Sequence, residues 1–339
     1  MGETVVVTGA AGFIGRWVVR ELLERGHVVR GLDDLSNGSR RNVAAFEDSD
    51  RFDLVEGDVC DMEAVASRFD DDVDACIHLA AEIDVQESLD DPQSHFEANV
   101  VGTQNVLECC RRTETRLGLV GTCMVYDMVD SEEGIDEDHS VKPASPYAGS
   151  KLAAENLAES YYHGYDLPVA ILRPFNTYGP FQKTGMAGGV VSIFTNRDLE
   201  DQPLKIFGDG TQTRDLLYAT DCARFIVEGT FSDDAIGEVL NAGTGSDISI
   251  NELAETIATE GTEIEHVEHH HPQSEVQKLL CDPSKAAEML GWEPQVSLEE
   301  GIDRLRTWLR EDKPAGSLEM SYDEDEVTTA DREAPSQSE

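Results

Sequence analysis

The chain has 339 residues, and 69 Asp and Glu against 26 Lys and Arg give it a formal net charge of −43 at pH 7. So acidic a surface repels nucleic acid and anionic membranes, and no apolar run approaches the length of a membrane span, so we expect neither as a partner. The first predicted strand begins at Thr4 and leaves no room for a signal peptide, and the seven cysteines form no C-x-x-C pair, so we expect a cytoplasmic protein with reduced thiols.

The acidic residues recur throughout the chain instead of gathering in a tail. Their mutual repulsion strains a compact state unless salt screens it, and the screening length shortens to about 3 Å at molar salt. We therefore predict a halophilic protein.

The first predicted element is a buried strand over Thr4–Val7, which leads into a glycine-rich turn and then a helix over Phe13–Arg25. Gly9 permits the tight turn, Gly12 lets the backbone approach a phosphate, and Gly15 lets the helix pack close to the strand. The N–H groups at the helix start then face an anion. The spacing is G-x-x-G-x-x-G, and it predicts a site for a dinucleotide pyrophosphate. The cofactor contacts predicted in this turn are Gly9, Gly12, Phe13, Ile14 and Gly15.

Three further strands are predicted to end at the same edge of a sheet, over His27–Leu32, Phe52–Glu56 and Val73–Leu79. Asp33 follows the first of them at the spacing expected for a ribose-binding carboxylate, and its charge would repel a 2′-phosphate, which favours NAD over NADP. A carboxylate at Asp58 would lie near the adenine. The cofactor contacts predicted at these strand ends are Asp33, Asp34, Asp58, Val59, Leu79, Ala80 and Ala81.

Strands and helices continue to alternate after the fourth strand. A long helical pattern runs from about Ser94 to Arg112, a fifth strand covers Leu117–Gly121, a helix runs from Pro146 to about His163, and a sixth strand covers Val169–Leu172. This rhythm predicts an α/β fold, a Rossmann-type doubly wound parallel sheet.

The rhythm becomes irregular beyond Pro174, where glycines and prolines multiply. We expect a dinucleotide-binding domain over 1–175 and a smaller mixed α/β substrate-binding lobe over 176–313, interwoven with the first domain. The stretch 314–339 is acidic and almost free of aromatic residues, which predicts a disordered tail.

Tyr147 and Lys151 stand four residues apart near the start of a helix, so both side chains project from one face. An ammonium group and an oxidised nicotinamide beside the phenol should lower the pKa of Tyr147 from about 10, because both positive charges favour the phenolate. Tyr147 would then act as a base near neutral pH.

These motifs resemble those of the extended short-chain dehydrogenases/reductases, in particular the nucleotide-sugar epimerases and dehydratases, from Thr4 to about Leu309. The matching segments are Thr8–Gly15, Asp33, Asp58-Val59, His78–Ala81, Asn99 with Gly102-Thr103, Thr122 before Val125-Tyr126, Tyr147 with Lys151, Arg173–Pro180 and Gly208–Asp215.

The resemblance implies a catalytic set of Thr122, Tyr147 and Lys151. Tyr147 would take the proton from a sugar hydroxyl while NAD takes the hydride from the same carbon. Thr122 would hydrogen-bond that oxygen, and Lys151 would hold the nicotinamide ribose. Asn99 is implied as a further cofactor contact.

The resemblance also implies residues that hold the nucleotide-diphosphate sugar. Asn176 would bind its phosphates and Arg214 would clamp the diphosphate, a duty that suits the planar fork of a guanidinium. On so acidic a surface, Arg173 and Arg214 would be positive islands that attract an anionic substrate. A homodimer through the helices over about Ser94–Arg112 and Pro146–His163 is implied as well.

Two segments depart from the family pattern. Sugar 4,6-dehydratases usually carry an Asp-Glu pair after the strand-end Thr, whereas this chain has Cys123 and Met124. A methionine transfers no proton, but Cys123 would serve as an acid or base if its thiol pKa were lowered, and otherwise it is a packing residue.

The second departure lies where relatives often have a diphosphate-gripping arginine. Here histidines precede Pro272–Val276, and His271 or Lys278 would substitute. No ligand spacing typical of zinc surrounds the histidines, so we expect no metal site.

The sequence therefore leads to three hypotheses. The first is an NAD-dependent 4-epimerase of a UDP-hexose, which needs no Asp-Glu pair. The second is a dehydratase that uses Cys123. The third is a non-catalytic dinucleotide-binding or sensing protein that has kept the fold.

Overall fold

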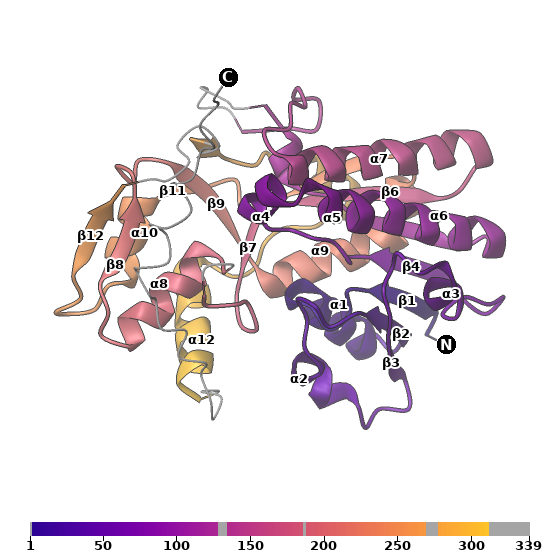
Figure 1. The fold of residues 1–339 in the computed structure, drawn as a ribbon, viewed down its shortest axis with the longest axis horizontal. Helices are drawn as coiled ribbons and strands as arrows, with labels where there is room; N and C mark the ends of the chain where they lie inside the picture. Colours follow the sequence, from indigo (N-terminus) through magenta and orange to yellow (C-terminus); the bar gives the residue numbers. More distant parts are fainter. Residues whose placement is uncertain (1, 128–133, 186–187, 269–276, 312–339) are drawn as a thin grey trace, which may run out of the picture.

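The computed structural model of the chain describes residues 2–127, 134–185, 188–268 and 277–311. Within them, seven parallel strands form one sheet in the order β10-β6-β5-β4-β1-β2-β3 (Figure 1). The order reverses direction between β1 and β4, which is the switch point where doubly wound folds bind ligands. The strands are β1 (Thr4–Thr8), β2 (Val28–Asp33), β3 (Phe52–Glu56), β4 (Ala75–His78), β5 (Arg116–Val120), β6 (Val169–Pro174) and β10 (Val239–Ala242).

Helices cover both faces of this sheet, and each face has its own apolar core. Figure 1 shows α6 and α7 on one side and α1 and α9 on the other. The strands are buried on both faces, which explains why they read as continuous apolar runs without alternation. The helices and short turns of this part are α1 (Phe13–Glu24), α2 (Arg40–Val43), η1 (Ala44–Phe46), α3 (Met62–Ala66), α4 (Val85–Asp90), α5 (Pro92–Phe96), η2 (Glu97–Val101), α6 (Gly102–Thr113), η3 (Cys123–Val125), α7 (Pro146–Tyr165), α9 (Ala219–Phe231), η4 (Asp233–Ala235) and α11 (Ser284–Leu290).

The long helical pattern predicted over about Ser94–Arg112 is present but is not one α-helix. The α-helical segments α5 and α6 are separated by η2, a π-helical turn. A π-turn inserts an extra residue into the helix and is frequent at functional sites. Here it contains Asn99, one of the predicted cofactor contacts.

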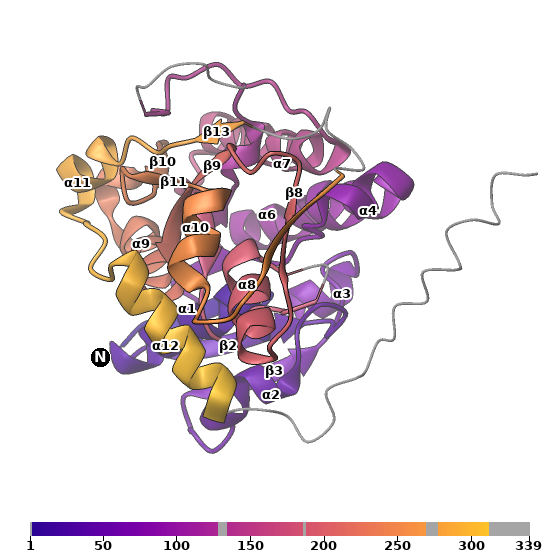
Figure 2. The ribbon, with the colours of Figure 1, turned by 90° about the vertical axis from the view of Figure 1, so that its left-hand side faces the viewer.

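A second lobe packs beside the carboxyl ends of the strands around its own apolar core. A four-stranded sheet joins β7, β9, β11 and β13, and a two-stranded sheet joins β8 and β12. Figure 2, in which this lobe faces the viewer, shows α8, α10 and α12 in front. The elements are β7 (Asn176–Tyr178), α8 (Val190–Leu199), β8 (Leu204–Phe207), β9 (Thr213–Tyr218), β11 (Asp247–Ser249), α10 (Ile250–Ile257), β12 (Ile264–Val267), β13 (Lys278–Leu279) and α12 (Leu298–Glu311).

The predicted fold class, a Rossmann-type doubly wound sheet with a smaller mixed lobe, is confirmed. The range 176–313 is not confined to the second lobe, because its strand β10 pairs in parallel with β6 of the first sheet. A parallel strand needs a crossover connection, and α9 is the helix of that connection. The predicted tail over 314–339 lies outside the described residues. None of the described helices has the length and apolar character needed to cross a membrane.

Candidate active site

The glycine-rich turn between β1 and α1 is shaped by positions where a side chain has no room. Gly9 has a positive φ of 69°, and a Cβ there would lie 2.8 Å from the Ala80 nitrogen. A Cβ on Gly15 would lie 1.9 Å from the Gly9 carbonyl oxygen, so only glycine lets α1 approach the turn this closely. No side chain caps α1 at Gly12, which leaves the helix start open to an anion. This backbone cradle fits a dinucleotide pyrophosphate.

Asp33 ends β2 beside this turn, as predicted. Its carboxylate accepts hydrogen bonds from the backbone N–H groups of Ala11 and Leu35, both at 2.9 Å, and the residue is 6% exposed. Burial raises its pKa above the usual value for an aspartate, against these hydrogen bonds. Asp34 is exposed and accepts a hydrogen bond from the Ser36 hydroxyl at 2.7 Å. Asp33 is therefore the carboxylate held at the turn, while Asp34 points into solvent.

The other predicted cofactor contacts lie at the ends of β3 and β4. Asp58 is exposed and accepts a hydrogen bond from the Cys60 N–H at 2.8 Å, while Val59 is buried. Leu79, Ala80 and Ala81 are half-buried. The Thr8 hydroxyl accepts hydrogen bonds from the Leu79 and Ala80 N–H groups, both at 3.2 Å, which fixes this segment against the end of β1.

The Asn99 side chain is fully engaged by the protein. Its Oδ1 accepts a hydrogen bond from the Glu82 N–H at 2.9 Å, and its Nδ2 donates to the Glu82 carbonyl and to the Ser150 hydroxyl, each at 2.9 Å. Asn99 therefore ties the segment after β4 to α7, which holds Tyr147 and Lys151.

Thr122 and Tyr147 lie together where β5 ends. Tyr147 is in the first turn of α7, whose start is fixed by Pro146 at its first position and by the Ser145 side chain as its cap. Thr122 lies close enough to Tyr147 to act on the phenol, and both residues are buried. Burial raises the pKa of Tyr147 to about 12, and the Thr122 side chain acts in the opposite direction. The protein's own groups therefore do not lower the phenol pKa, and the predicted lowering depends on the charge of an oxidised nicotinamide.

Lys151 lies one helical turn after Tyr147 and is 5% exposed. Its ammonium group donates a hydrogen bond to the Val120 carbonyl oxygen at 2.7 Å, so the end of β5 anchors Lys151 two residues before Thr122. Burial lowers its pKa to about 8, and the neighbouring Glu155 opposes the shift.

Cys123 is also part of this cluster, but its thiol is not primed to ionise. The residue is 4% exposed, and burial raises its pKa to about 12, although the positive charge of Arg214 acts in the opposite direction. The lowered thiol pKa that would make Cys123 an acid or base is therefore not what the chain provides.

The two predicted substrate-binding residues lie on neighbouring strands of the second lobe. β7 pairs with β9 so that Asn176 stands opposite Leu216, which places Asn176 on the same face as Arg214. The Oδ1 atom of Asn176 is buried and has no hydrogen-bond partner among the described residues, as expected for an atom that meets a ligand. Arg214 is half-buried, and its Nη1 donates to the Thr213 carbonyl at 2.7 Å.

Arg173 is not the positive island that the sequence predicts. Its guanidinium is paired with Glu155 in the interior, with an Nη2 to Oε2 distance of 2.6 Å and exposed side-chain fractions of 6% and 3%. β6 is a central strand of the parallel sheet, so its side chains face helices and not solvent. Arg173 therefore cannot attract a substrate from solution.

The histidine-rich departure lies largely outside the described residues, which exclude His269–His271 and Pro272–Val276. His266 lies in β12, exposed, with its ring nitrogen 3.0 Å from the Gly208 carbonyl oxygen. Lys278 begins β13, opposite Thr213 and so next to Arg214 along β9. Among the described residues, no group of His, Cys, Asp and Glu is arranged to hold a metal ion.

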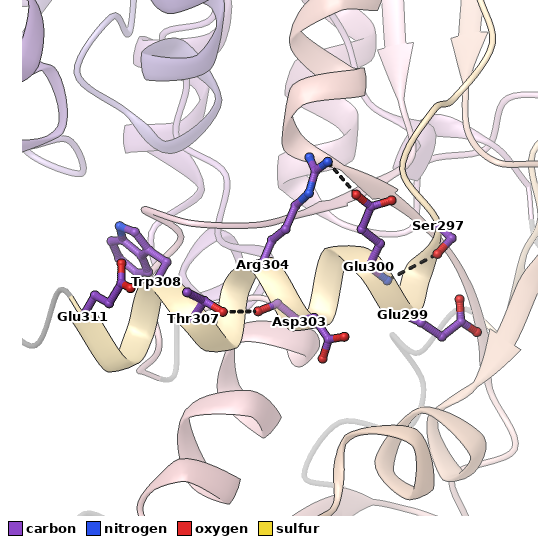
Figure 3. Close-up of a pocket in the computed structure, with 8 residues that line it drawn as sticks. All are labelled: Ser297, Glu299, Glu300, Asp303, Arg304, Thr307, Trp308 and Glu311. Carbon is purple, nitrogen blue, oxygen red and sulfur yellow. Dashed lines mark hydrogen bonds and ion pairs between the residues drawn. The ribbon is translucent and has the colours of Figure 1, made fainter.

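A surface hollow of about 720 Å³ along α12 contains none of these residues (Figure 3). Carboxylates dominate its lining, and the guanidinium of Arg304 is paired there with Glu300 at 2.6 Å. Such a lining repels an anionic substrate, so this hollow is not the active site. The lining residues are Ser297, Glu299, Glu300, Asp303, Arg304, Thr307, Trp308 and Glu311.

Two buried networks around the site escaped the sequence analysis. His78 lies between the Thr8 hydroxyl at 2.6 Å and the Thr103 hydroxyl at 3.0 Å, and burial lowers its pKa to about 3. Glu155 pairs with Arg173. A signal for Glu155 was present, because Tyr147, Lys151 and Glu155 recur every four residues on one helix face.

Comparisons with known proteins show the family of the chain. A family model described as GDP-mannose 4,6 dehydratase matches residues 6–305. The chain is 37% identical to a UDP-glucose 4-epimerase of Mycolicibacterium smegmatis over 90% of its length and 98% of that protein.

Among solved structures, the chain is similar to Pal from Bacillus thuringiensis, with 52% identity, a TM-score of 0.89, and coverage of 91% of this chain and 99% of that one. It is also similar to DesIV, a dTDP-glucose 4,6-dehydratase from Streptomyces venezuelae, with 31% identity, a TM-score of 0.84, and coverage of 91% and 97%. The chain belongs to the extended short-chain dehydrogenase/reductase family of NAD-dependent nucleotide-sugar epimerases and dehydratases. The predicted family is confirmed.

Proposed function

We propose that the protein is an NAD-dependent 4-epimerase of a nucleotide-diphosphate sugar, with a UDP-hexose as the first candidate. The observation that carries the proposal is the convergence at the end of β5. Thr122 lies beside Tyr147 and lowers its phenol pKa against the effect of burial, and the Lys151 ammonium is fixed to the carbonyl of Val120. When bound, NAD supplies a hydride acceptor that returns the hydride later in the same turnover.

The chain's own residues supply the proton transfer. Tyr147 takes the proton from the hydroxyl of the carbon being oxidised, and Thr122 holds that oxygen in place. Burial raises the phenol pKa, so positive charge must be close to Tyr147 when it acts as a base. The nearby protonated Lys151 and the cationic nicotinamide are the two sources of that charge.

The substrate's diphosphate binds to the second lobe. Asn176 offers a buried oxygen without a hydrogen-bond partner in the described part of the chain, and it lies on the same face of the sheet as Arg214, whose guanidinium suits two phosphate oxygens. The sugar then rotates as a 4-keto intermediate within the site, and the hydride returns to its opposite face. This inverts carbon 4 without loss of atoms.

A second candidate is a nucleotide-sugar dehydratase. Cys123 favours it, because this thiol lies in the catalytic cluster and is influenced by both Arg214 and Arg173. Elimination of water needs a proton donor for the leaving hydroxyl, and the neutral thiol is the side chain at the position where the family's dehydratases carry their acid. Relatives with both activities match the chain over most of its length.

The product mass separates the two candidates. The protein is incubated with NAD in high salt with UDP-glucose, UDP-N-acetylglucosamine or dTDP-glucose, and the products are examined by mass spectrometry and NMR. An unchanged mass with inverted carbon 4 supports the epimerase, whereas loss of one water supports the dehydratase. Cys123→Ala should leave an epimerase active and should abolish dehydration. Absence of turnover with every sugar nucleotide, together with retained NAD, would instead favour a non-catalytic dinucleotide-binding protein.

We also infer a homodimer, as the family resemblance implies. Large apolar side chains are exposed on the helices expected to form the interface, with Phe96 of α5 at 53% and Tyr165 at the end of α7 at 58%. Sedimentation analysis tests this, and replacing Phe96 and Tyr165 by Ser should shift the protein toward the monomer.

A further inference from the structure

A buried ion pair lies directly behind the catalytic cluster. Glu155 of α7 accepts hydrogen bonds on Oε2 from Nε and Nη2 of Arg173, at 3.1 and 2.6 Å, and both side chains are almost fully buried. A buried ion pair is by itself weak support for stability, because desolvation offsets most of the attraction. Its position beside the site calls for another explanation.

The pair occupies the space between the two anchors of the catalytic set. The end of β5 presents three consecutive residues, of which Val120 accepts the hydrogen bond of Lys151 and Thr122 lies close enough to Tyr147 to act on its phenol. A Cβ on the intervening Gly121 would lie 2.2 Å from Glu155 Oε1 and 3.0 Å from Arg173 Cγ. The ion pair therefore packs against the backbone that fixes both anchors.

The remaining oxygen of the carboxylate has no partner. Glu155 Oε1 is buried without a hydrogen bond in the described part of the chain, and Glu155 lies one helical turn after Lys151. Lys151 is the buried cation next along the same helix face, so the unpartnered oxygen of this ion-paired carboxylate acts on Lys151 through the electrostatic field.

We propose that Glu155 and Arg173 are positioning residues of the proposed sugar-nucleotide oxidation: Glu155 keeps Lys151 protonated, and Arg173 holds Glu155 against Gly121. The expected change in kcat rests on the proposed function, whereas the effect of Glu155 on the protonation of Lys151 does not. Arg173 also offsets the charge of Glu155, whose negative charge alone would oppose ionisation of Tyr147.

Among the titratable groups considered around Lys151, Glu155 is the one that stabilises its ammonium form. His78 of β4 faces Lys151 but is uncharged, since its pKa is lowered to about 3. Tyr147 and Cys123 are neutral, with pKa values raised to about 12. From β6, Arg173 is the facing charge, and it stacks on the Tyr126 ring with 4.8 Å from Cζ to the ring centre.

The test is the titration of Lys151 in the NAD-loaded protein carrying Glu155→Gln. Side-chain NMR of isotope-labelled lysine reports the pKa of Lys151, with its signal assigned by loss in Lys151→Arg. Loss of the anion and the unpaired Arg173 cation both disfavour the ammonium form, so the pKa should fall by about 1 unit or more. The alkaline limb of the kcat profile should move to lower pH by the same amount, with KM little changed.

Glu159→Gln is the matched control. Glu159 lies one turn further along α7, exposed at 58% of its side chain and near His163, so removing its charge should leave the titration of Lys151 in place. A second variant, Glu155→Gln with Arg173→Met, removes both charges of the ion pair. It leaves no buried arginine without a partner and is used if the single variant does not fold. Its Lys151 pKa should lie between those of the single variant and the wild type.

An unmoved Lys151 titration in both variants would overturn the inference, as would a kcat that falls equally at every pH, since either result describes a structural role only. Because the titration needs no turnover, a shifted Lys151 pKa in a protein that converts no sugar nucleotide would refute the proposed function and leave the electrostatic role standing.

Discussion

The cofactor half and the substrate half of the site are assembled in different ways. In the cofactor half, consecutive residues of one strand, turn and helix form a cradle from backbone atoms. Gly9 and Gly15 allow this close approach because a Cβ at either position would clash with neighbouring backbone atoms. In the proposed substrate half, Asn176 and Arg214 lie on the same face of a sheet because β7 pairs with β9, although the two residues are far apart in the sequence. The dinucleotide cradle is thus encoded locally, whereas the proposed substrate site depends on how the second lobe pairs its strands.

Tyr147→Phe should have the largest effect on turnover. In the proposed reaction the phenol lies between the cofactor half and the substrate half, and it takes the proton from the sugar hydroxyl as the hydride leaves the same carbon. Removing a general base typically lowers kcat by about 10² to 10⁴-fold. Turnover of the sugar nucleotide identified as substrate measures the loss, and bound NAD in the purified protein serves as the control. A variant that keeps wild-type turnover would contradict the assignment of Tyr147.

Gly15→Ala addresses the cofactor half alone. The added Cβ would lie 1.9 Å from the Gly9 carbonyl oxygen, so the turn must shift away from the pyrophosphate. Overpacking of this kind costs about 1–3 kcal/mol, which corresponds to roughly 10 to 100-fold weaker NAD binding. Fluorescence titration with NAD measures the change.

Gly164→Ala is the matched control for that substitution. Gly164 lies in α7 with nothing within 4 Å of an added Cβ, so alanine should leave NAD affinity unchanged and raise stability by about 0.5–1 kcal/mol. Equal loss of NAD affinity in both variants would show that the close approach at Gly15 is irrelevant.

Arg214→Met addresses the substrate half. Hydrogen bonds to charged groups contribute about 1.5–3 kcal/mol, so loss of the guanidinium should raise KM for the nucleotide sugar roughly 10 to 100-fold. NAD affinity should stay constant, because the cradle lies on the other side of the site. Arg304→Met on α12 is the control, since that arginine lines the hollow that we exclude as the active site. An equal rise in KM in Arg304→Met would contradict the assignment of substrate binding to Arg214.

The same contrast decides what could be predicted from the sequence. The sheet, the glycine turn, Asp33 at the end of β2 and the spacing of Tyr147 and Lys151 all follow from residues near in the chain. The local pattern could not show that Arg173 is buried against Glu155, because that pairing joins β6 to α7 through the packed interior. For the same reason the sequence did not show that burial raises the pKa values of both Tyr147 and Cys123, since burial is a tertiary property. The priming of both groups by a bound oxidised nicotinamide stays a prediction.

Salt should have the smallest effect, and it should act on the two halves alike. Carboxylates are exposed both near the cofactor cradle, at Asp34 and Asp58, and on α12, at Glu299, while the pair of Glu155 and Arg173 is shielded from solvent. With a net charge of −43, screening should relieve repulsion across the surface. We expect the melting temperature to rise by about 2 °C between 0.1 M and 3 M KCl, a shift that corresponds to roughly 1–2 kcal/mol for a chain of this size. Chloride is the right salt because sulfate stabilises folded proteins in general.

Near-UV circular dichroism, which reports the packed interior, should follow the same single transition as far-UV circular dichroism. Glu299→Gln should slightly reduce the salt dependence, because it removes one of the repelling charges. Full stability in dilute buffer, with no further gain in molar KCl, would refute the halophilic proposal and would mean that the acidic surface is tolerated without screening.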